Sequence, residues 1–165
     1  MPDPKAFKNV LSRFASGVTV VTTMSDGKAH GLTVSAFTSV SADPPRILVC
    51  LGRETSSRPM VERSGVFAVH ILGSEHARMG MRFAKMLPDI KEPFEGLGYR
   101  TEATGAPILD DCLAWLDCKV DSAIEVGDHT VFVGAVEALG VVSEGWPVLY
   151  YDRNWRVLRE EPLEP

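Results

Sequence analysis

Hydroxyl-bearing side chains gather in two stretches of this sequence, and their chemistry suits the binding of a phosphate. Residues 33–41 read Thr-Val-Ser-Ala-Phe-Thr-Ser-Val-Ser, and a second group, residues 55–57, follows shortly after an apolar run. Hydroxyl groups and free backbone N–H groups can hold a phosphate without a glycine-rich loop. Small residues such as Ala36 also let a ligand lie close to the backbone. The other interpretation of residues 33–41 is a half-exposed strand, in which hydroxyl and apolar residues alternate.

A second candidate is the segment Gly127-Asp128-His129, which joins two long runs of strand-forming residues. Glycine followed by aspartate is a frequent turn sequence, so a solvent-exposed hairpin is one interpretation. The other is functional, because a histidine at the start of a rigid strand and next to solvent can orient a substrate that enters from outside. The segment alone leaves both interpretations open.

Other kinds of chemistry find little support in the sequence. The motifs of nucleotide-phosphate loops, dinucleotide-binding turns, zinc proteases and serine hydrolases are absent from it. Five residues separate Cys112 from Cys118, and five separate His70 from His76, and neither spacing is that of a zinc site. With Cys50 the cysteines number three, which favours reduced thiols and a cytoplasmic location. We therefore expect neither a bound metal nor a catalytic cysteine.

Length, composition and charge set the class of protein. The chain has 165 residues, 45% of them hydrophobic and 24% charged, which predicts one globular domain over residues 1–165. No apolar run approaches the ~20 residues of a membrane span, and the beginning of the chain lacks the apolar segment of a signal peptide. The 17 basic and 22 acidic residues give a net charge of −5. Neither a membrane nor a nucleic acid is therefore an expected partner.

The patterning predicts a mainly β protein with a few helices. Too few helices alternate with the strands for a doubly wound sheet, so we expect an antiparallel barrel. Helices are predicted over residues 3–17, where Asp3 is the expected cap, and over 55–64 and 74–86. A long surface connection is predicted over residues 87–108. The expected strands span residues 18–24, 31–37, 47–51, 67–72, 116–125, 129–139, 147–151 and 155–157.

Several segments together carry a family resemblance. They are residues 14–23, residues 30–41 followed by Pro44-Pro45 and the strand 47–51, and then residues 67–72, 83–84, 127–130 and 147–151. In this order and spacing they resemble the short-chain flavin reductase family, which includes the reductase components of two-component monooxygenases. The resemblance extends from about Phe7 to Val157.

The resemblance implies both a fold and an activity. The fold would be an antiparallel, Greek-key split β-barrel of the FMN-binding type, present as a homodimer with FMN or FAD near the subunit interface. The enzyme would transfer a hydride from NADH or NADPH to the flavin and could then supply reduced flavin to a partner monooxygenase. Because the flavin carries out the redox chemistry, no acid–base pair of side chains is required.

Site residues are carried over from the family by position. Asp128 and His129 would lie near the nicotinamide, and Thr55 and Ser56 would hold the flavin phosphate. The aromatic pair that closes the pocket would be Tyr150 and Tyr151. The remaining cofactor-binding residues would be Thr33, Val34, Ser35 and Ala36 at the isoalloxazine edge, Ser39, Val40 and Ser41 beyond them, Cys50, Leu51 and Gly52 on the next strand, and Phe83 and Lys85 near the phosphate or adenine side.

The chain departs from the family pattern at two places. Asp152-Arg-Asn-Trp155 replaces the Arg-Gly or Ser-Gly and further aromatic residue that often follow the aromatic pair. Glu54 stands where a basic or small polar residue is common, so we expect its side chain to point away from a phosphate. We expect Arg53, Arg58 and Lys85 to form the positive patch that faces the phosphate.

Two other functions on the same fold remain open at this point. One is an electron-transfer flavoprotein that holds FMN tightly, and the other is a non-catalytic split-barrel binding module. In all three cases a homodimer is expected, because a barrel of this size leaves strand edges and an apolar face to cover. The residues expected in that interface are Trp115, Phe132 and Trp146.

Overall fold

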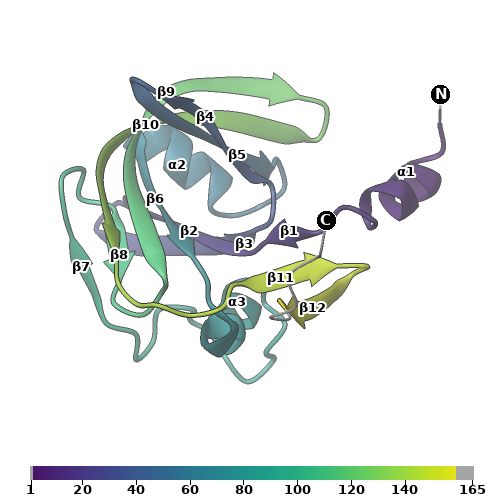
Figure 1. Ribbon diagram of the computed structural model, residues 1–165. Coiled ribbons are helices and arrows are strands. Elements are labelled where there is room, and N and C mark those ends of the chain that lie inside the picture. Colours follow the sequence, from purple (N-terminus) through teal and green to yellow (C-terminus); the bar gives the residue numbers. More distant parts are fainter. Residues whose placement is uncertain (1, 159–165) are drawn as a thin grey trace.

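The computed structural model describes residues 2–158, and its centre is a seven-stranded antiparallel sheet (Figure 1). Runs of β-branched and apolar residues form these strands, as such residues pack well on a pleated surface. The order across the sheet is β3-β2-β6-β9-β10-β5-β4. The seven strands are β2 (Thr19–Ser25), β3 (Lys28–Val34), β4 (Phe37–Ala42), β5 (Pro45–Gly52), β6 (Val66–Ile71), β9 (Ala114–Val126) and β10 (His129–Val141).

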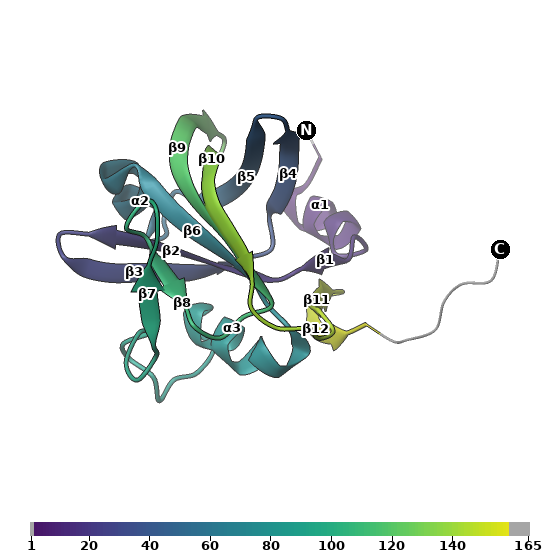
Figure 2. The same ribbon diagram turned by 60° about the vertical axis from the view of Figure 1, so that its left-hand side comes forward.

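The sheet rolls into a barrel because of the way β3 is joined to β4. These two strands are the opposite edges of the sheet, yet only Ser35 and Ala36 lie between them in sequence. So short a connection reaches roughly 10 Å, so the two edges must meet there. We call this two-residue junction the seam. The Cys50 N–H of β5 donates to the Ala36 carbonyl at 3.0 Å, which ties the seam to β5. The predicted antiparallel barrel is confirmed (Figures 1 and 2).

The sequences Asp26-Gly27 and Gly127-Asp128 are typical of tight turns, and each of them forms one in the structure. The β2–β3 hairpin turns at Asp26 and Gly27, whose φ angles are 53° and 73°. Positive φ at both central residues gives the turn whose twist matches that of the flanking strands. The β9–β10 hairpin turns at Gly127 and Asp128, and Gly127 has a φ of 58°.

The barrel interior is filled by the inward-facing residues of these strands. Along β5, residues 47, 49 and 51 are buried and the residues between them are partly exposed. Phe132 pairs with Val49 across the ladder and shares its inward face, which leaves it fully buried. Trp115 is 7% exposed and pairs with the buried His70 of β6. The prediction that Phe132 and Trp115 face a partner subunit is therefore wrong, and of the three proposed residues only Trp146 is exposed.

His70 is a buried polar residue whose hydrogen bonds join three parts of the barrel. Its Nδ1 lies 3.0 Å from the Val20 carbonyl of β2 and donates to it, while Nε2 accepts from the Leu109 N–H at 3.0 Å. Burial disfavours the charged imidazolium and lowers the pKa of His70 to about 4. His70 is therefore a neutral structural residue at physiological pH.

The first helix begins as predicted but ends early, and among residues 2–158 it packs so loosely that none of its own residues is buried. α1 (Pro4–Leu11) starts after Asp3, whose carboxylate accepts the Ala6 N–H at 3.0 Å. The predicted helix extended to residue 17. Its apolar residues are exposed, with Phe7 at 57% and Val10 at 70%. Figure 1 shows α1 projecting from the barrel, so in the described part of one subunit its apolar face is exposed.

The other two helices pack against the barrel. α2 (Arg58–Ser64) begins three residues later than predicted and ends at Gly65, whose φ of 69° suits a helix C-terminus. A 3₁₀ turn, η1 (Ser74–His76), precedes α3 (Ala77–Phe83), which ends three residues before the predicted end.

Two small sheets complete the fold. One has the order β1-β11-β12, so the C-terminal hairpin pairs with the segment that follows α1. The other is a hairpin of β7 and β8, which begins inside the predicted surface connection at residues 87–108 and ends one residue beyond it. The bounds of these strands are β1 (Ser16–Gly17), β7 (Tyr99–Thr101), β8 (Pro107–Leu109), β11 (Val148–Tyr151) and β12 (Asn154–Val157). Within residues 2–158, no helix is both long and apolar enough to cross a membrane.

Candidate active site

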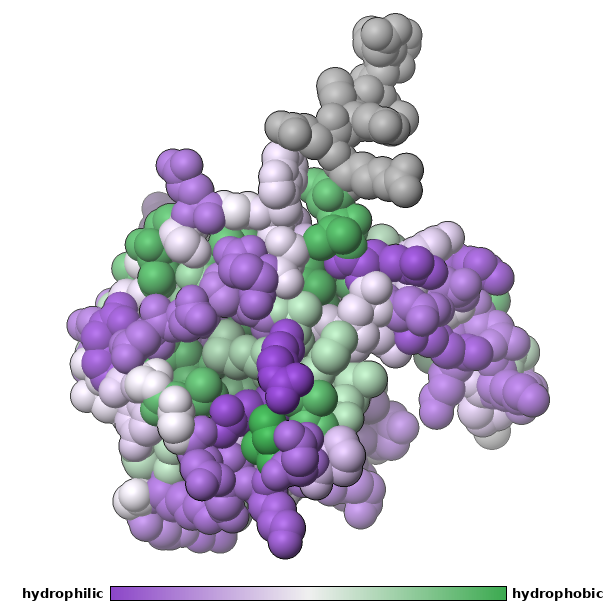
Figure 3. Space-filling view, turned by 90° about the horizontal axis from the view of Figure 1, so that it is seen from below, coloured by the Kyte–Doolittle hydropathy of each residue, from purple (hydrophilic) through white to green (hydrophobic). Residues whose placement is uncertain are grey.

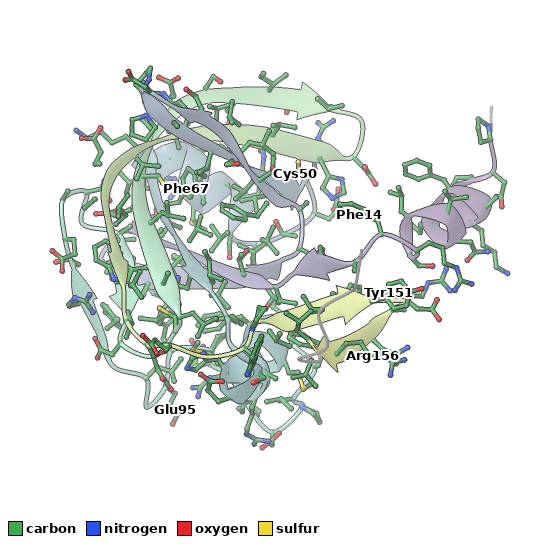
Figure 4. All side chains as sticks on the ribbon, viewed as in Figure 1. Phe14, Cys50, Phe67, Glu95, Tyr151 and Arg156 are labelled. Atoms are coloured by element: carbon green, nitrogen blue, oxygen red, sulfur yellow. The ribbon has the colours of Figure 1, made fainter. Side chains whose placement is uncertain are left out.

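An open pocket of about 810 Å³ lies at the seam. Its walls come from distant parts of the chain, namely α1 and the segment after it, the seam, β4, β5 and the tip of the β11–β12 hairpin. The lining is mainly apolar, and both this lining and the volume are typical of sites for small organic ligands. Of the residues predicted for the site, those that line this pocket are Ser35, Ala36, Cys50 and Tyr150. Figure 4 labels Cys50 on β5 and Phe14 on the segment after α1, which both contribute to the wall.

The outward face of β5 extends the pocket wall toward the β9–β10 turn. Leu48 and Cys50 line the pocket, and Gly52 is the next residue on the same face. Gly52 pairs with His129 of β10, and paired residues of adjacent strands lie side by side on one face. The alternation along β5 therefore brings the predicted nicotinamide residue close to the end of the pocket.

His129 is held in place by its neighbour Asp128. Nδ1 of His129 donates to Oδ1 of Asp128 at 2.8 Å, and the imidazole remains 47% exposed. This hydrogen bond is the main reason that the pKa of the Asp128 carboxyl lies below its ordinary value. Nε2 lies 3.9 Å from the place that a Cβ on Gly52 would take, so this nitrogen faces the end of β5. The bond to Asp128 leaves Nε2 available to a ligand that lies over Gly52.

The loop after β5 contains the predicted phosphate residues. The Thr55 hydroxyl donates to the Gly52 carbonyl at 2.7 Å, so its proton is already used within the loop. The Ser57 hydroxyl donates to the Gly31 carbonyl of β3 at 3.2 Å. Ser56 is exposed, and no hydrogen bond of its hydroxyl is found among residues 2–158. Ser56 is therefore the hydroxyl of this loop that is free to donate to a phosphate.

The end of α3 reaches the same residue of β3. Phe83 is 2% exposed, and a Cβ on Gly31 would lie 2.7 Å from its ring, so this close approach requires glycine. The Thr33 hydroxyl donates to the Gly80 carbonyl of α3. Gly31 thus brings together the loop of residues 53–57 and α3, while Lys85 follows the helix as an exposed residue with a φ of 58°.

Some predicted site residues do not offer their side chains to the pocket. Val34 and Leu51 are 6% and 1% exposed and pack in the barrel core, and Phe83 is buried likewise, so a ligand could meet these residues only through their backbone. Tyr151 is partly exposed beside the pocket-lining Tyr150. Outside the pocket lining, on β4, are Ser39, Val40 and Ser41, where the ladder to β5 has an irregularity.

The structure adds residues that the sequence did not single out. Leu48 and Thr38 pair across β5 and β4 and both line the pocket, which the alternation along residues 45–52 could have indicated. Lys8, Phe14 and Arg153 also line it, but they come from the two ends of the described chain. Their contribution depends on the pairing of β1 with β11, which no local pattern reveals.

The expected positive patch is partly neutralised. Arg53 and Arg58 both contact Glu125 of β9, at 3.8 Å and 3.2 Å between nitrogen and oxygen. Lys85 comes from a separate segment of the chain, shortly after α3. The loop of residues 53–57 is therefore flanked by arginines that already have an acidic partner.

The cysteines are protonated thiols at neutral pH. Burial raises the pKa of Cys112 to about 11 and that of Cys118 to about 12, and it also raises the pKa of the pocket-lining Cys50. A thiolate, rather than a thiol, is the nucleophile in cysteine chemistry. Cys50, the cysteine in the pocket lining, is therefore not activated as a nucleophile.

The barrel and its pocket define a class of protein. The structure is a small antiparallel barrel with an apolar-walled hollow at its seam. The family described as "Flavin reductase like domain" matches residues 11–159. This chain belongs to that family, and it is an NAD(P)H-dependent flavin reductase with the split-barrel fold.

Individual relatives agree with this assignment. A flavin reductase of Pseudomonas putida is 40% identical over 150 residues, which cover 90% of this chain and 86% of the relative. The protein named FMN reductase (NADH) RutF 2 of Methylorubrum extorquens is 39% identical over 153 residues, covering 93% and 88%. The crystal structure of a nitrilotriacetate monooxygenase component B from Mycobacterium thermoresistibile has a TM-score of 0.89 and 34% identity, over 98% of this chain and 89% of the other.

Proposed function

We propose that the seam pocket binds FMN and that this chain reduces it with NADH. The observation that carries the proposal is the arrangement along β5. Cys50 lies in the apolar wall of the pocket. Two residues later, Gly52 pairs with His129 of β10, and the loop with the free Ser56 hydroxyl follows Gly52 in the sequence. An isoalloxazine ring against Ala36 and Cys50 would direct its phosphate arm toward that loop.

The flavin, when bound, supplies the acceptor for the hydride of the nicotinamide. The chain's own residues bind and orient the two partners. His129 is proposed to contact the nicotinamide with Nε2, because Asp128 holds its other ring nitrogen. Hydride transfer needs the reacting atoms about 3–3.5 Å apart, so this positioning contributes directly to the rate.

The choice of FMN and NADH rests on the loop and on a relative. The 53–57 loop offers the free Ser56 hydroxyl to a phosphate group, and the Methylorubrum relative is named an NADH-dependent FMN reductase. FAD and NADPH are the competing ligands. Further predicted contacts of the flavin remain part of the proposal, namely those with Thr33, Val34, Ser39, Val40, Ser41, Leu51, Thr55, Phe83, Lys85 and Tyr151.

We further propose that the enzyme is a homodimer. α1 presents its apolar face to solvent in one subunit, and Ile124 and Val126 are 52% and 56% exposed on the outward side of β9. Val126 pairs with His129, so a partner covering this side would also border the flavin site. The face seen in Figure 3 has its apolar residues in separate patches, which makes it a poorer candidate.

The biological setting completes the proposal. The chain forms one domain, and its three free cysteines suit the cytoplasm. The reduced flavin passes to a separate monooxygenase, a role supported by the name of the Mycobacterium structure. A reductase of this kind must release its flavin, whereas an electron-transfer flavoprotein would keep it.

Steady-state oxidation of NADH and NADPH, each with FMN, FAD and riboflavin, tests the activity. We expect turnover to be most efficient with NADH and FMN. Retention of the yellow colour after dialysis would instead support the electron-transfer flavoprotein, and absence of nucleotide oxidation would support the binding module.

The phosphate assignment has its own test. Losing one charge-assisted hydrogen bond costs about 1.5–3 kcal/mol. The double variant Thr55→Ala, Ser56→Ala should therefore weaken FMN binding by about 10-fold or more and leave riboflavin, which has no phosphate, nearly unchanged. Of the two single variants, Ser56→Ala should account for most of the loss of FMN affinity. A matched control is Thr38→Ala, which changes a pocket hydroxyl away from this loop and should affect both ligands equally.

A further inference from the structure

A cluster of charged side chains lies beside the loop to which we assign the flavin phosphate. Arg53 and Arg58 both contact the same carboxylate oxygen, Oε1 of Glu125, at 3.8 Å and 3.2 Å. Arg53 directly follows Gly52, and Arg58 is the first residue of α2, so the two arginines flank residues 54–57. Glu125 thus provides these guanidinium groups with the kind of oxygen ligand that a phosphate would provide.

Arg58 is firmly held by other residues. Its Nε donates to the Thr130 hydroxyl at 3.0 Å, and one terminal nitrogen lies 3.1 Å from the Glu62 carboxylate. Its side chain is only 18% exposed. Because all three nitrogens of the Arg58 guanidinium have partners, this residue has a structural role between α2 and the end of the barrel.

Arg53 is held loosely by comparison. Its side chain is 49% exposed, and besides the 3.8 Å contact with Glu125 it makes a 3.5 Å hydrogen bond to the Gly127 carbonyl. Its backbone N–H donates to the Asp128 carbonyl at 2.9 Å, which fixes the start of the side chain near the loop. The guanidinium can therefore turn toward a phosphate without breaking a short hydrogen bond.

We propose that Glu125 competes with the flavin phosphate for Arg53 and thereby lowers the affinity of the enzyme for FMN. The proposal rests on the proposed function, because it takes the phosphate to lie at residues 53–57. Exposed ion pairs are weak, so the competition adjusts the affinity without preventing binding. Glu125 is then a residue that makes the flavin a released product rather than a permanently bound group.

The test measures the dissociation constants of FMN and riboflavin by quenching of flavin fluorescence. Glu125→Gln keeps the size of the side chain and removes its charge, and it should tighten FMN binding by about 2- to 5-fold without changing riboflavin. Arg53→Gln should weaken FMN binding alone. In the double variant Arg53→Gln, Glu125→Gln the tighter FMN binding seen in Glu125→Gln should disappear, because the Arg53 guanidinium for which Glu125 and the phosphate compete is missing.

Controls separate this mechanism from other effects of charge. Glu137→Gln removes another exposed carboxylate of the same hairpin, one that pairs with Lys119 at 3.9 Å, and should change neither dissociation constant. Glu125→Asp withdraws the carboxylate from Arg53 while keeping its charge, and should tighten FMN binding to a smaller extent. This variant also serves if Glu125→Gln fails to fold, as judged by circular dichroism.

The possible outcomes are distinct. A gain that persists in the Arg53→Gln background, or equal tightening of riboflavin, overturns the inference, because Glu125 would then act through general repulsion or through the shape of the pocket. A wild-type enzyme that binds FMN and riboflavin equally well contradicts the phosphate assignment itself. Preference for FMN in the wild type, combined with a gain that requires Arg53, supports both.

Discussion

Removal of the His129 imidazole is the most direct test of how the nicotinamide is positioned. In the structure this side chain lies beside Gly52 at the end of the pocket wall, and Asp128 holds it through one hydrogen bond of 2.8 Å. The variant His129→Ala deletes the ring without disturbing the barrel core, because the side chain is 47% exposed. We expect slower reduction of the bound flavin with little change in flavin affinity.

The magnitude follows from the contacts that are lost. One hydrogen bond contributes about 0.5–1.5 kcal/mol, and loss of a near-attack arrangement adds to the barrier. Together these give about 1.4–2.7 kcal/mol, which corresponds to a rate of flavin reduction about 10- to 100-fold lower. Asp128→Asn should cause a smaller loss, because the amide oxygen still accepts from the imidazole while the charge is gone.

Anaerobic stopped-flow absorbance measures the reduction step itself. The rate should fall in His129→Ala both at limiting and at saturating NADH, while the matched variant Glu137→Gln, on the same strand but outside the site, should behave as wild type. An unchanged rate in His129→Ala at both concentrations would refute the reasoning. His129 would then be a turn residue, and the nicotinamide contact would have to come from Tyr150, Tyr151 or Trp155.

Three further predictions concern the assembly, the thiols and the pH dependence of stability. Val10→Glu places a charge on the apolar face of α1 outside the pocket lining, and light scattering should show a shift from dimer toward monomer; an unaltered dimer would exclude α1 from the interface. The triple variant with serine at Cys50, Cys112 and Cys118 should keep its turnover per bound flavin, and loss of NADH-dependent flavin reduction in the folded variant would make a cysteine essential. For His70, with its pKa lowered to about 4, the unfolded state binds more protons between about pH 6.5 and 4, so the free energy of unfolding should fall by up to about 1.4 kcal/mol per pH unit as the pH decreases through this range. Denaturant unfolding at several pH values checks this, and His70→Gln should remove that part of the slope.

The barrel could be predicted from the sequence because its signals are local. The apolar run of β5, the alternating residues of β9 and the turn residues Asp26 and Gly127 specify strands and hairpins without knowledge of distant contacts. The same alternation does not say which face is inward. The aromatic ring of Phe132 was for this reason expected at a subunit interface, whereas its pairing with Val49 places it in the core.

The candidate site was only partly predictable, because its walls join segments far apart in the chain. Family resemblance supplied Ser35, Ala36 and Cys50, which do line the pocket. Nothing local indicated that Lys8 and Arg153 would join them, since both depend on the pairing of the two chain ends. The hydrogen bonds within the loop after β5 cannot be predicted from the sequence either. They show that the Thr55 hydroxyl is already occupied, whereas the Ser56 hydroxyl is free within the described part of the chain.

The seam also has a consequence for the order in which the protein can assemble. Ser35 and Ala36 are made early in synthesis, yet the edges they join are held around the barrel by β6, β9 and β10, which are made later. Pairings between segments so distant in sequence form slowly, because the chain loses entropy on closing a large loop before any favourable contact compensates for that loss. A growing chain therefore cannot close the barrel until β10 has left the ribosome, and the pocket is complete only when Tyr150 and Arg153 of the later β11–β12 hairpin have joined it.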